Sequence, residues 1–102
     1  MGSKSIKAGI VGGAGYTGGE TLRLLVNHPN VEISFVQSRS QADKSITDIH
    51  HDLVGDTDLK FVDTLGDADV VFLCLGHGES KVFLEQNVIP EKTKVIDLSQ
   101  DF

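Results

Sequence analysis

The stretch Gly12-Gly13-Ala14-Gly15-Tyr16-Thr17-Gly18-Gly19 decides the fold. It follows the apolar run Ala8-Gly9-Ile10-Val11 and leads into Glu20–Val26. A strand, a glycine-rich turn and a helix in this order form a cradle for phosphate, because glycines let the backbone approach an anion closely while the first N–H groups of the helix point at it. The sequence therefore predicts a dinucleotide-binding site.

The glycines of this turn fit two registers, Gly13-x-Gly15-x-x-Gly18 and Gly12-x-x-Gly15-x-x-Gly18, and the sequence does not choose between them. A turn that merely joins a strand to a helix is the alternative to a binding site. The context favours binding, since a second apolar segment, Val31–Val36, completes a β-α-β unit of the expected size. A Walker-type phosphate loop is excluded because no Gly-Lys-Ser/Thr closes the run.

The end of the second predicted strand indicates which dinucleotide is bound. An NAD site carries an Asp or Glu there, which accepts hydrogen bonds from the ribose hydroxyls. This chain has Ser38-Arg39-Ser40 instead. The arginine offers a planar fork of donors and the serines offer hydroxyls, which suit the 2′-phosphate of NADP. The alternative is that Arg39 is an ordinary solvated surface arginine.

Composition bounds the class of protein. The chain has 102 residues, 39% of them hydrophobic, which suits one compact α/β domain over residues 1–102 but is small for a complete dinucleotide enzyme. The formal charge of -6 and the pI near 5.0 argue against nucleic acid or an anionic membrane as partner. The sequence has no apolar run of membrane-spanning length, and a single cysteine rules out an internal disulfide. We therefore expect a cytoplasmic protein.

The rest of the chain continues the alternation of strands and helices. After the first β-α-β unit the pattern predicts, in order, a helix over 45–54, a strand over 59–62, a strand over 68–75, a helix over 80–88 and a strand over 93–98. Such alternation is typical of a Rossmann-type doubly wound sheet, mainly parallel, with about five strands in the order 3-2-1-4-5.

Ligands of doubly wound sheets bind outside the carboxyl ends of the strands, where the strand order reverses. In the predicted order this point lies between the first and the fourth strand. We therefore expect four segments to meet there: Gly12–Gly18, Ser38–Ser40, Gly76–Gly78 and Ser99.

Four segments carry a family resemblance: Gly12–Glu20, Ser38–Ser40, Leu75–Ser80 and Val95–Phe102. They are similar to successive signatures of the N-acetyl-gamma-glutamyl-phosphate reductases, NADP-dependent enzymes of arginine biosynthesis, and the resemblance spans essentially the whole chain. The Gly-Tyr-Thr-Gly turn and the Val-Ile-Asp-Leu-Ser-x-Asp-Phe segment are specific together, although aspartate-semialdehyde dehydrogenases share the glycine pattern. The chain departs from the family at Ala14, where serine is common, and at Gly76, where proline is common.

The resemblance implies acyl-phosphate reduction. In that family a cysteine thiolate displaces phosphate from the acyl phosphate, NADPH delivers hydride to the thioester, and a histidine assists proton transfer. The family's Asn-Pro-Gly-Cys-Tyr segment and its histidine motif are absent from residues 1–102. The resemblance thus implies the NADP-binding portion of the enzyme, without a catalytic residue.

The cofactor contacts that the resemblance implies fall into three groups. They are Gly12, Gly13, Gly15, Tyr16, Thr17 and Gly18 at the pyrophosphate, Ser38, Arg39 and Ser40 at the 2′-phosphate, and Gly76 and His77 toward the nicotinamide. The complete enzyme is expected to be a homo-oligomer that reduces N-acetylglutamyl 5-phosphate to N-acetylglutamate 5-semialdehyde. There are two alternatives: another acyl-phosphate reductase of the aspartate-semialdehyde dehydrogenase type, or a free-standing dinucleotide-binding module without catalytic activity.

Three other candidate sites have simpler interpretations. Cys74 lies within an apolar run, where a thiol is usually a small buried hydrophobic group rather than a nucleophile. Asp48, His51 and Asp52 have helical spacing, but three such groups more often form a solvated face, so we expect no metal site. His77 follows a strand at the ligand edge, and the sequence assigns it no role.

Overall fold

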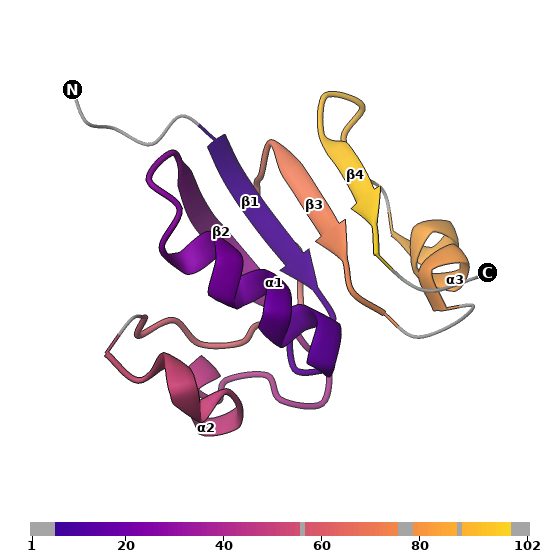
Figure 1. Cartoon of the computed structure of the whole chain (residues 1–102). Helices are drawn as coiled ribbons and strands as arrows, with labels where there is room; N and C mark the ends of the chain where they lie inside the picture. Colours follow the sequence, from indigo (N-terminus) through magenta and orange to yellow (C-terminus); the bar gives the residue numbers. More distant parts are fainter. Residues whose placement is uncertain (1–5, 56, 76–78, 88, 99–102) are drawn as a thin grey trace.

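The computed structural model describes residues 6–55, 57–75, 79–87 and 89–98. Four strands form one parallel sheet in the order β2-β1-β3-β4. They are β1 (Ile6–Val11), β2 (Val31–Gln37), β3 (Val70–Leu73) and β4 (Lys94–Asp97). The helical elements are α1 (Tyr16–Val26), α2 (Ile46–Ile49), the 3-10 turn η1 (His51–Leu53) and α3 (Glu79–Gln86). Figure 1 shows the strands running side by side with α1 across one face of the sheet.

The predicted doubly wound topology is confirmed. Because β1 leads through α1 to β2 on one side and β3 leads through α3 to β4 on the other, the strand order reverses between β1 and β3. Right-handed crossovers that move in opposite directions put their helices on opposite faces. The packing agrees, since Leu22 of α1 belongs to one core cluster and Phe83 of α3 belongs to another.

The two clusters follow the alternation of side chains along the strands. Ile10 and Val36 point to the α1 face, whereas Val11 and Phe35 point to the α3 face. A parallel sheet covered on both faces needs apolar residues at consecutive positions, which explains the unbroken apolar run of β3. The edge strand β4 differs, because all four of its residues are exposed.

The strand predicted at 59–62 is not formed. Only an isolated parallel bridge joins Val62 to Gln37, at the outer side of β2 where the third strand of the order 3-2-1-4-5 was expected. The N–H of Val62 donates to the carbonyl of Val36, but both backbone groups of Phe61 bond to the loop at Asp43 and Lys44. The ladder therefore stops after one residue, and the sheet has four strands rather than about five.

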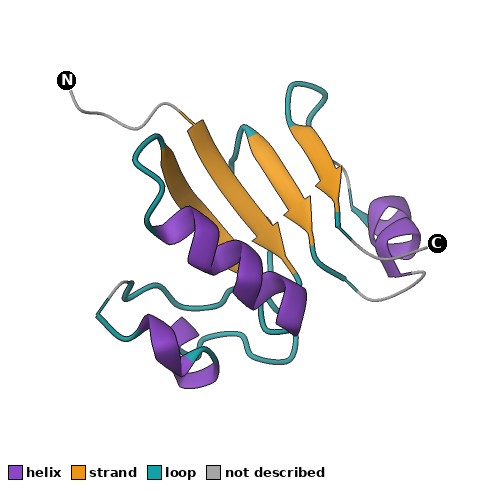
Figure 2. Cartoon of the chain, in the orientation of Figure 1, coloured by secondary structure: helices purple, strands orange, loops and turns teal. Residues whose placement is uncertain are grey.

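The helix predicted over 45–54 is also interrupted. It is divided into α2 and η1 at His50, whose backbone leaves the helical region with φ of -108° and ψ of 80°. Figure 2 shows these short pieces as a separate unit beyond the sheet, below α1. The apolar residues Ile46 and Leu53 still reach the core on either side of the break.

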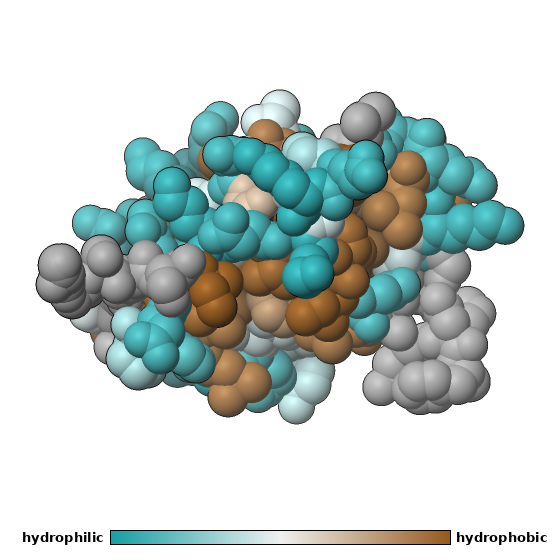
Figure 3. Space-filling view, turned by 90° about the horizontal axis from the view of Figure 1, so that it is seen from above, coloured by the Kyte–Doolittle hydropathy of each residue, from teal (hydrophilic) through white to brown (hydrophobic). Residues whose placement is uncertain are grey.

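The surface holds apolar side chains beside polar ones. Seen from above, an apolar area extends across the middle of the molecule between polar margins (Figure 3). Exposed large hydrophobic side chains include Val82 of α3 and Val95 and Ile96 of β4. In the part of the chain that the structure describes, no helix is long and apolar enough to cross a membrane.

Candidate functional site

A cavity of about 700 Å³ opens at the carboxyl ends of the strands, where the strand order reverses. Its walls come from the turn after β1, the segment after β2, the end of β3 and the inner side of α3. The lining residues are Gly12, Ala14, Gly15, Gln37, Ser38, Arg39, Ser40, Cys74, Leu75, Glu79, Val82, Phe83 and Gln86. This is the position at which doubly wound sheets bind nucleotides.

The glycine turn is held from beneath by the end of β2. The carbonyl oxygen of Gln37 accepts hydrogen bonds of 2.9 Å from the N–H groups of both Gly12 and Gly13, and its side-chain Oε1 lies 3.3 Å from the N–H of Gly12. These two N–H groups are therefore used within the protein. They shape the turn and are not available to a bound anion.

The geometry assigns different tasks to the glycines. Gly12 has φ of +81°, a conformation that favours glycine, and a Cβ there would lie 2.8 Å from the carbonyl oxygen of Cys74. A Cβ on Gly18 would lie 2.6 Å from the carbonyl oxygen of Gly12, so the helix and the turn after β1 pack too closely for a side chain. By contrast, the nearest atom to a Cβ on Gly15 is 4.0 Å away.

This distribution resolves the register of the motif. A dinucleotide-binding turn uses its first glycine for the tight turn, its second to let a phosphate approach, and its third for close packing of the helix. Gly12, Gly15 and Gly18 have these three environments, and Gly15 lines the cavity. The spacing Gly12-x-x-Gly15-x-x-Gly18 is therefore the one that matches the fold.

The start of α1 offers free hydrogen-bond donors. The first N–H groups of a helix have no acceptor within the helix, and the helix dipole makes this end attractive to anions. Gly15 is the N-cap residue and makes no side-chain cap. Within the described ranges, four backbone N–H groups of the turn and the first turn of α1 have no protein acceptor: those of Ala14, Tyr16, Thr17 and Gly18.

The segment after β2 places three polar side chains at the cavity. Ser38 is buried, and its hydroxyl accepts a 3.3 Å hydrogen bond from the N–H of Gln41, while Arg39 and Ser40 are exposed. Among the residues that the structure describes, Arg39 forms no ion pair. The guanidinium is therefore available to an anion that enters the cavity.

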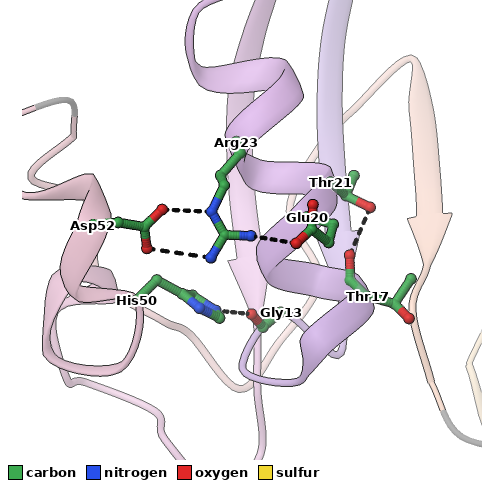
Figure 4. Close-up of polar contacts among 7 residues, drawn as sticks. All are labelled: Gly13, Thr17, Glu20, Thr21, Arg23, His50 and Asp52. Carbon is green, nitrogen blue, oxygen red and sulfur yellow. Dashed lines mark hydrogen bonds and ion pairs between the residues drawn. The ribbon is translucent and has the colours of Figure 1, made fainter.

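The turn is also held from the side of α2 and η1 (Figure 4). The Nε2 atom of the buried His50 lies 2.7 Å from the carbonyl oxygen of Gly13. Arg23 of α1 reaches between Glu20 and Asp52, with Nη1 2.8 Å from Glu20 and Nε and Nη2 on the two oxygens of Asp52. The hydrogen bond from Arg23 lowers the pKa of the Asp52 carboxyl below its usual value.

Cys74 follows β3 and lines the inner wall of the cavity. It is buried in the core cluster beneath α1, and its Sγ lies 3.6 Å from the hydroxyl of Thr21. Burial raises the pKa of the thiol above its usual value, although the contact with Thr21 acts in the opposite direction. The burial of Cys74 agrees with its place in an apolar run of the sequence.

The structure brings five of the predicted contact residues into the cavity wall: Gly12, Gly15, Ser38, Arg39 and Ser40. Gly13 and Gly18 are buried beneath the turn, and Tyr16 and Thr17 lie at the start of α1 without lining the cavity. Gly76, His77, Gly78 and Ser99 lie outside the described residues. Within the described ranges, no group of three or more possible metal ligands occurs, at Asp48, His51 and Asp52 or elsewhere.

Sequence reasoning missed two parts of the site. The first is the wall formed by α3, with Glu79, Val82 and Gln86, which the doubly wound topology could have indicated. The second is His50. The spacing of Ile46, Ile49, His50 and Leu53 follows one face of a helix and could have indicated that His50 is buried, although not that it contacts Gly13.

The chain matches one family model and is similar to several named proteins. Residues 7–102 match the family model "Semialdehyde dehydrogenase, NAD binding domain". Proteins named N-acetyl-gamma-glutamyl-phosphate reductase are 58% identical over 98 residues in Christiangramia forsetii and 54% identical over 99 residues in Phocaeicola vulgatus. The chain spans 30% and 31% of those two relatives, which cover 95% of it.

A solved structure shares the fold. The aspartate semialdehyde dehydrogenase of Candida albicans, crystallised with NADP, has a TM-score of 0.74 and 22% sequence identity. The match covers 95% of this chain and 30% of that one. At this identity the likeness supports the Rossmann-type architecture alone.

Proposed function

This chain belongs to the family of semialdehyde dehydrogenase NAD-binding domains, and on that premise we propose that it is the NADP(H)-binding domain of an N-acetyl-gamma-glutamyl-phosphate reductase. The whole enzyme would reduce N-acetylglutamyl 5-phosphate to the 5-semialdehyde. Relatives with that name at 54% and 58% identity support this substrate over aspartyl phosphate. When bound, NADPH supplies the hydride for the reduction.

The residues of the cavity fit the cofactor. The open space at Gly15 admits a phosphate, and the unbonded N–H groups at the start of α1 would donate to the pyrophosphate. Arg39 and the two serines would hold the 2′-phosphate. The apolar side chains of Leu75 and Val82 line the same cavity and would contact the adenine.

The observation that carries the proposal is the unpaired Arg39 at the end of β2, in the place where an NAD site has a carboxylate. Cofactor preference is therefore the test. Titration of the chain with NADP⁺ and NAD⁺ by calorimetry should show a preference for NADP⁺ on the order of ten- to a hundredfold, as expected for a charge-assisted contact. Equal affinity, or tighter binding of NAD⁺, would contradict the proposal.

Two variants sharpen this test. Arg39→Ala should remove most of the preference and leave the affinity for NAD⁺ little changed, since NAD⁺ has no group at the 2′ position for the guanidinium to bind. Lys92→Ala is the matched control, because Lys92 is an exposed cation just before β4, at the opposite end of the strands. It removes one positive charge and should leave the preference unchanged. Full discrimination in Arg39→Ala would assign the 2′-phosphate to another residue.

The remaining expectations concern the complete enzyme and its setting. Binding of an acyl phosphate, assembly into a homo-oligomer and a cytoplasmic location stay predictions from the sequence and from the named relatives. In the whole enzyme, this domain would hold NADPH so that its hydride can reach an acyl group bound to a nucleophile outside residues 1–102. An assay of the longer protein with both acyl phosphates would distinguish the two reductases. We expect it to reduce N-acetylglutamyl phosphate in preference to aspartyl phosphate.

A further inference from the structure

The carbonyl oxygen of Gly13 receives a hydrogen bond from a side chain far along the sequence. His50 Nε2 lies 2.7 Å from it, and both groups are buried. A carbonyl oxygen only accepts, so Nε2 carries the proton of this bond. The bond joins the glycine turn to the segment between α2 and η1 (Figure 4).

The peptide that His50 holds is the one that joins Gly13 to Ala14. In a trans peptide the N–H points opposite to the C=O, so fixing the Gly13 carbonyl also fixes the N–H of Ala14. Ala14 lines the cavity, and within the described ranges its N–H has no protein acceptor. A donor bound to the carbonyl also polarises the peptide and strengthens its N–H as a donor.

The surroundings of His50 leave its ring little freedom. A Cβ on Gly19 would lie 2.7 Å from the ring, so α1 comes this close only because residue 19 is glycine. On another side the ring meets Phe61 edge to face, with centroids 6.3 Å apart. The imidazole is thus held between α1 and the core while its Nε2 faces the turn.

We propose that His50 is a positioning residue for the cofactor, which orients the Gly13–Ala14 peptide so that the N–H of Ala14 faces the pyrophosphate. The inference rests on the proposed function, since it presumes that a pyrophosphate binds at this turn. It adds a residue from outside the glycine motif to the binding machinery. It also gives a task to α2 and η1, which hold His50 beneath the turn.

The test compares two probes in the 102-residue chain. NADP⁺ reaches both the turn and Arg39, whereas 2′-AMP carries the 2′-phosphate but has no pyrophosphate. His50→Leu should weaken binding of NADP⁺ by about tenfold, the effect of one lost charge-assisted or polarised hydrogen bond. The same variant should bind 2′-AMP with unchanged affinity, since a general loss of structure would weaken both.

Conservative variants separate positioning from packing. His50→Gln keeps an N–H donor that reaches the position of Nε2 and should restore affinity for NADP⁺ to within about threefold of wild type. His50→Asn is too short to reach and should behave like His50→Leu, and it replaces that variant if the leucine protein does not fold. His51→Leu is the control, because His51 is exposed.

A spectroscopic signal reports on the peptide directly. The amide proton of Ala14 should shift in the NMR spectrum of His50→Leu and return toward its wild-type position in His50→Gln. Wild-type affinity for NADP⁺ in both His50→Leu and His50→Asn would overturn the inference, as would equal loss of NADP⁺ and 2′-AMP binding. If wild-type protein fails to bind NADP⁺ at all, the proposed function itself is wrong.

Discussion

At the scale of single residues, Gly15 and Gly18 lie in one turn but face different surroundings. The nearest atom to a Cβ on Gly15 would be the carbonyl oxygen of Gly12 at 4.0 Å, whereas a Cβ on Gly18 would lie 2.6 Å from backbone atoms of Gly12 and Gly13. Gly15 also has φ of -84° and ψ of -177°, which any residue can adopt. The backbone around Gly15 therefore has room for a side chain, and the backbone around Gly18 has none.

This difference makes Gly15→Val a specific probe of cofactor binding. The branched side chain would occupy the space that a phosphate needs, so affinity for NADP⁺ should be lost. The free energy of unfolding should fall by only about 1 kcal/mol, the cost of a poorer N-cap residue at an exposed position. Urea denaturation and calorimetric titration of the same sample measure the two effects.

Gly18→Val supplies the contrast. It should destabilise the fold by about 1 to 3 kcal/mol, because helix and turn must separate to admit the side chain. If Gly15→Val binds NADP⁺ as wild type does, the phosphate lies elsewhere.

At the scale of elements, α1 is joined to α2 and η1 at two places. At its exposed side Arg23 bridges Glu20 and Asp52, a contact that contributes little to stability because both partners are solvated. At its buried side Gly19 admits the ring of His50. The buried side of this contact brings His50 to the carbonyl oxygen of Gly13 in the turn, whereas the exposed ion pairs of Arg23 do not touch the turn.

The contact between Gly19 and His50 predicts that the effect of Gly19→Ala on stability changes sign when His50 is also replaced. Gly19→Ala alone should destabilise the protein by about 1 to 3 kcal/mol, because the new methyl group displaces a buried, hydrogen-bonded ring. In a His50→Ala background the same change should stabilise it by up to about 1 kcal/mol, the helix propensity of alanine over glycine. Equal effects of Gly19→Ala in the two backgrounds, measured by urea denaturation, would show that the two residues do not interact.

At the scale of the whole molecule, the cavity at the carboxyl ends of the strands has one thiol in its wall, that of Cys74. The single cysteine of the chain is Cys74, which is buried and whose thiol pKa is raised by that burial. Acyl transfer to sulfur needs a thiolate positioned at the acyl carbon. The chain spans about a third of the relatives it matches, and their names describe the activity of a longer protein.

We therefore expect the 102-residue chain to bind NADPH without oxidising it when N-acetylglutamyl phosphate is added. The absorbance of reduced nicotinamide measures the rate, and the full-length reductase of Bacteroides fragilis, 56% identical to the chain, is the positive control. Turnover that Cys74→Ala abolishes would identify Cys74 as the nucleophile. Turnover that survives this change would mean that the reduction needs no cysteine.

Much of the fold could be predicted from the sequence, because its signals are local. A glycine run between an apolar strand and a helix, followed by further alternation, determined the parallel sheet, the reversal between β1 and β3, and the place of the cavity. The position of Arg39 just after β2 could likewise be read from the sequence. Such features depend on residues that are neighbours in the chain, so their patterns survive without coordinates.

Only the tertiary structure decided the features that depend on distant neighbours. The glycines of the turn have different surroundings in the fold. Gly12 lies against Cys74, Gly15 faces the cavity, and Gly18 packs against the turn itself. The predicted strand at 59–62 was lost because Phe61 bonds to the loop at Lys44. The contact of His50 with the carbonyl oxygen of Gly13 was likewise decided by the fold, because the two residues are 37 positions apart and their pairing leaves no pattern in the sequence.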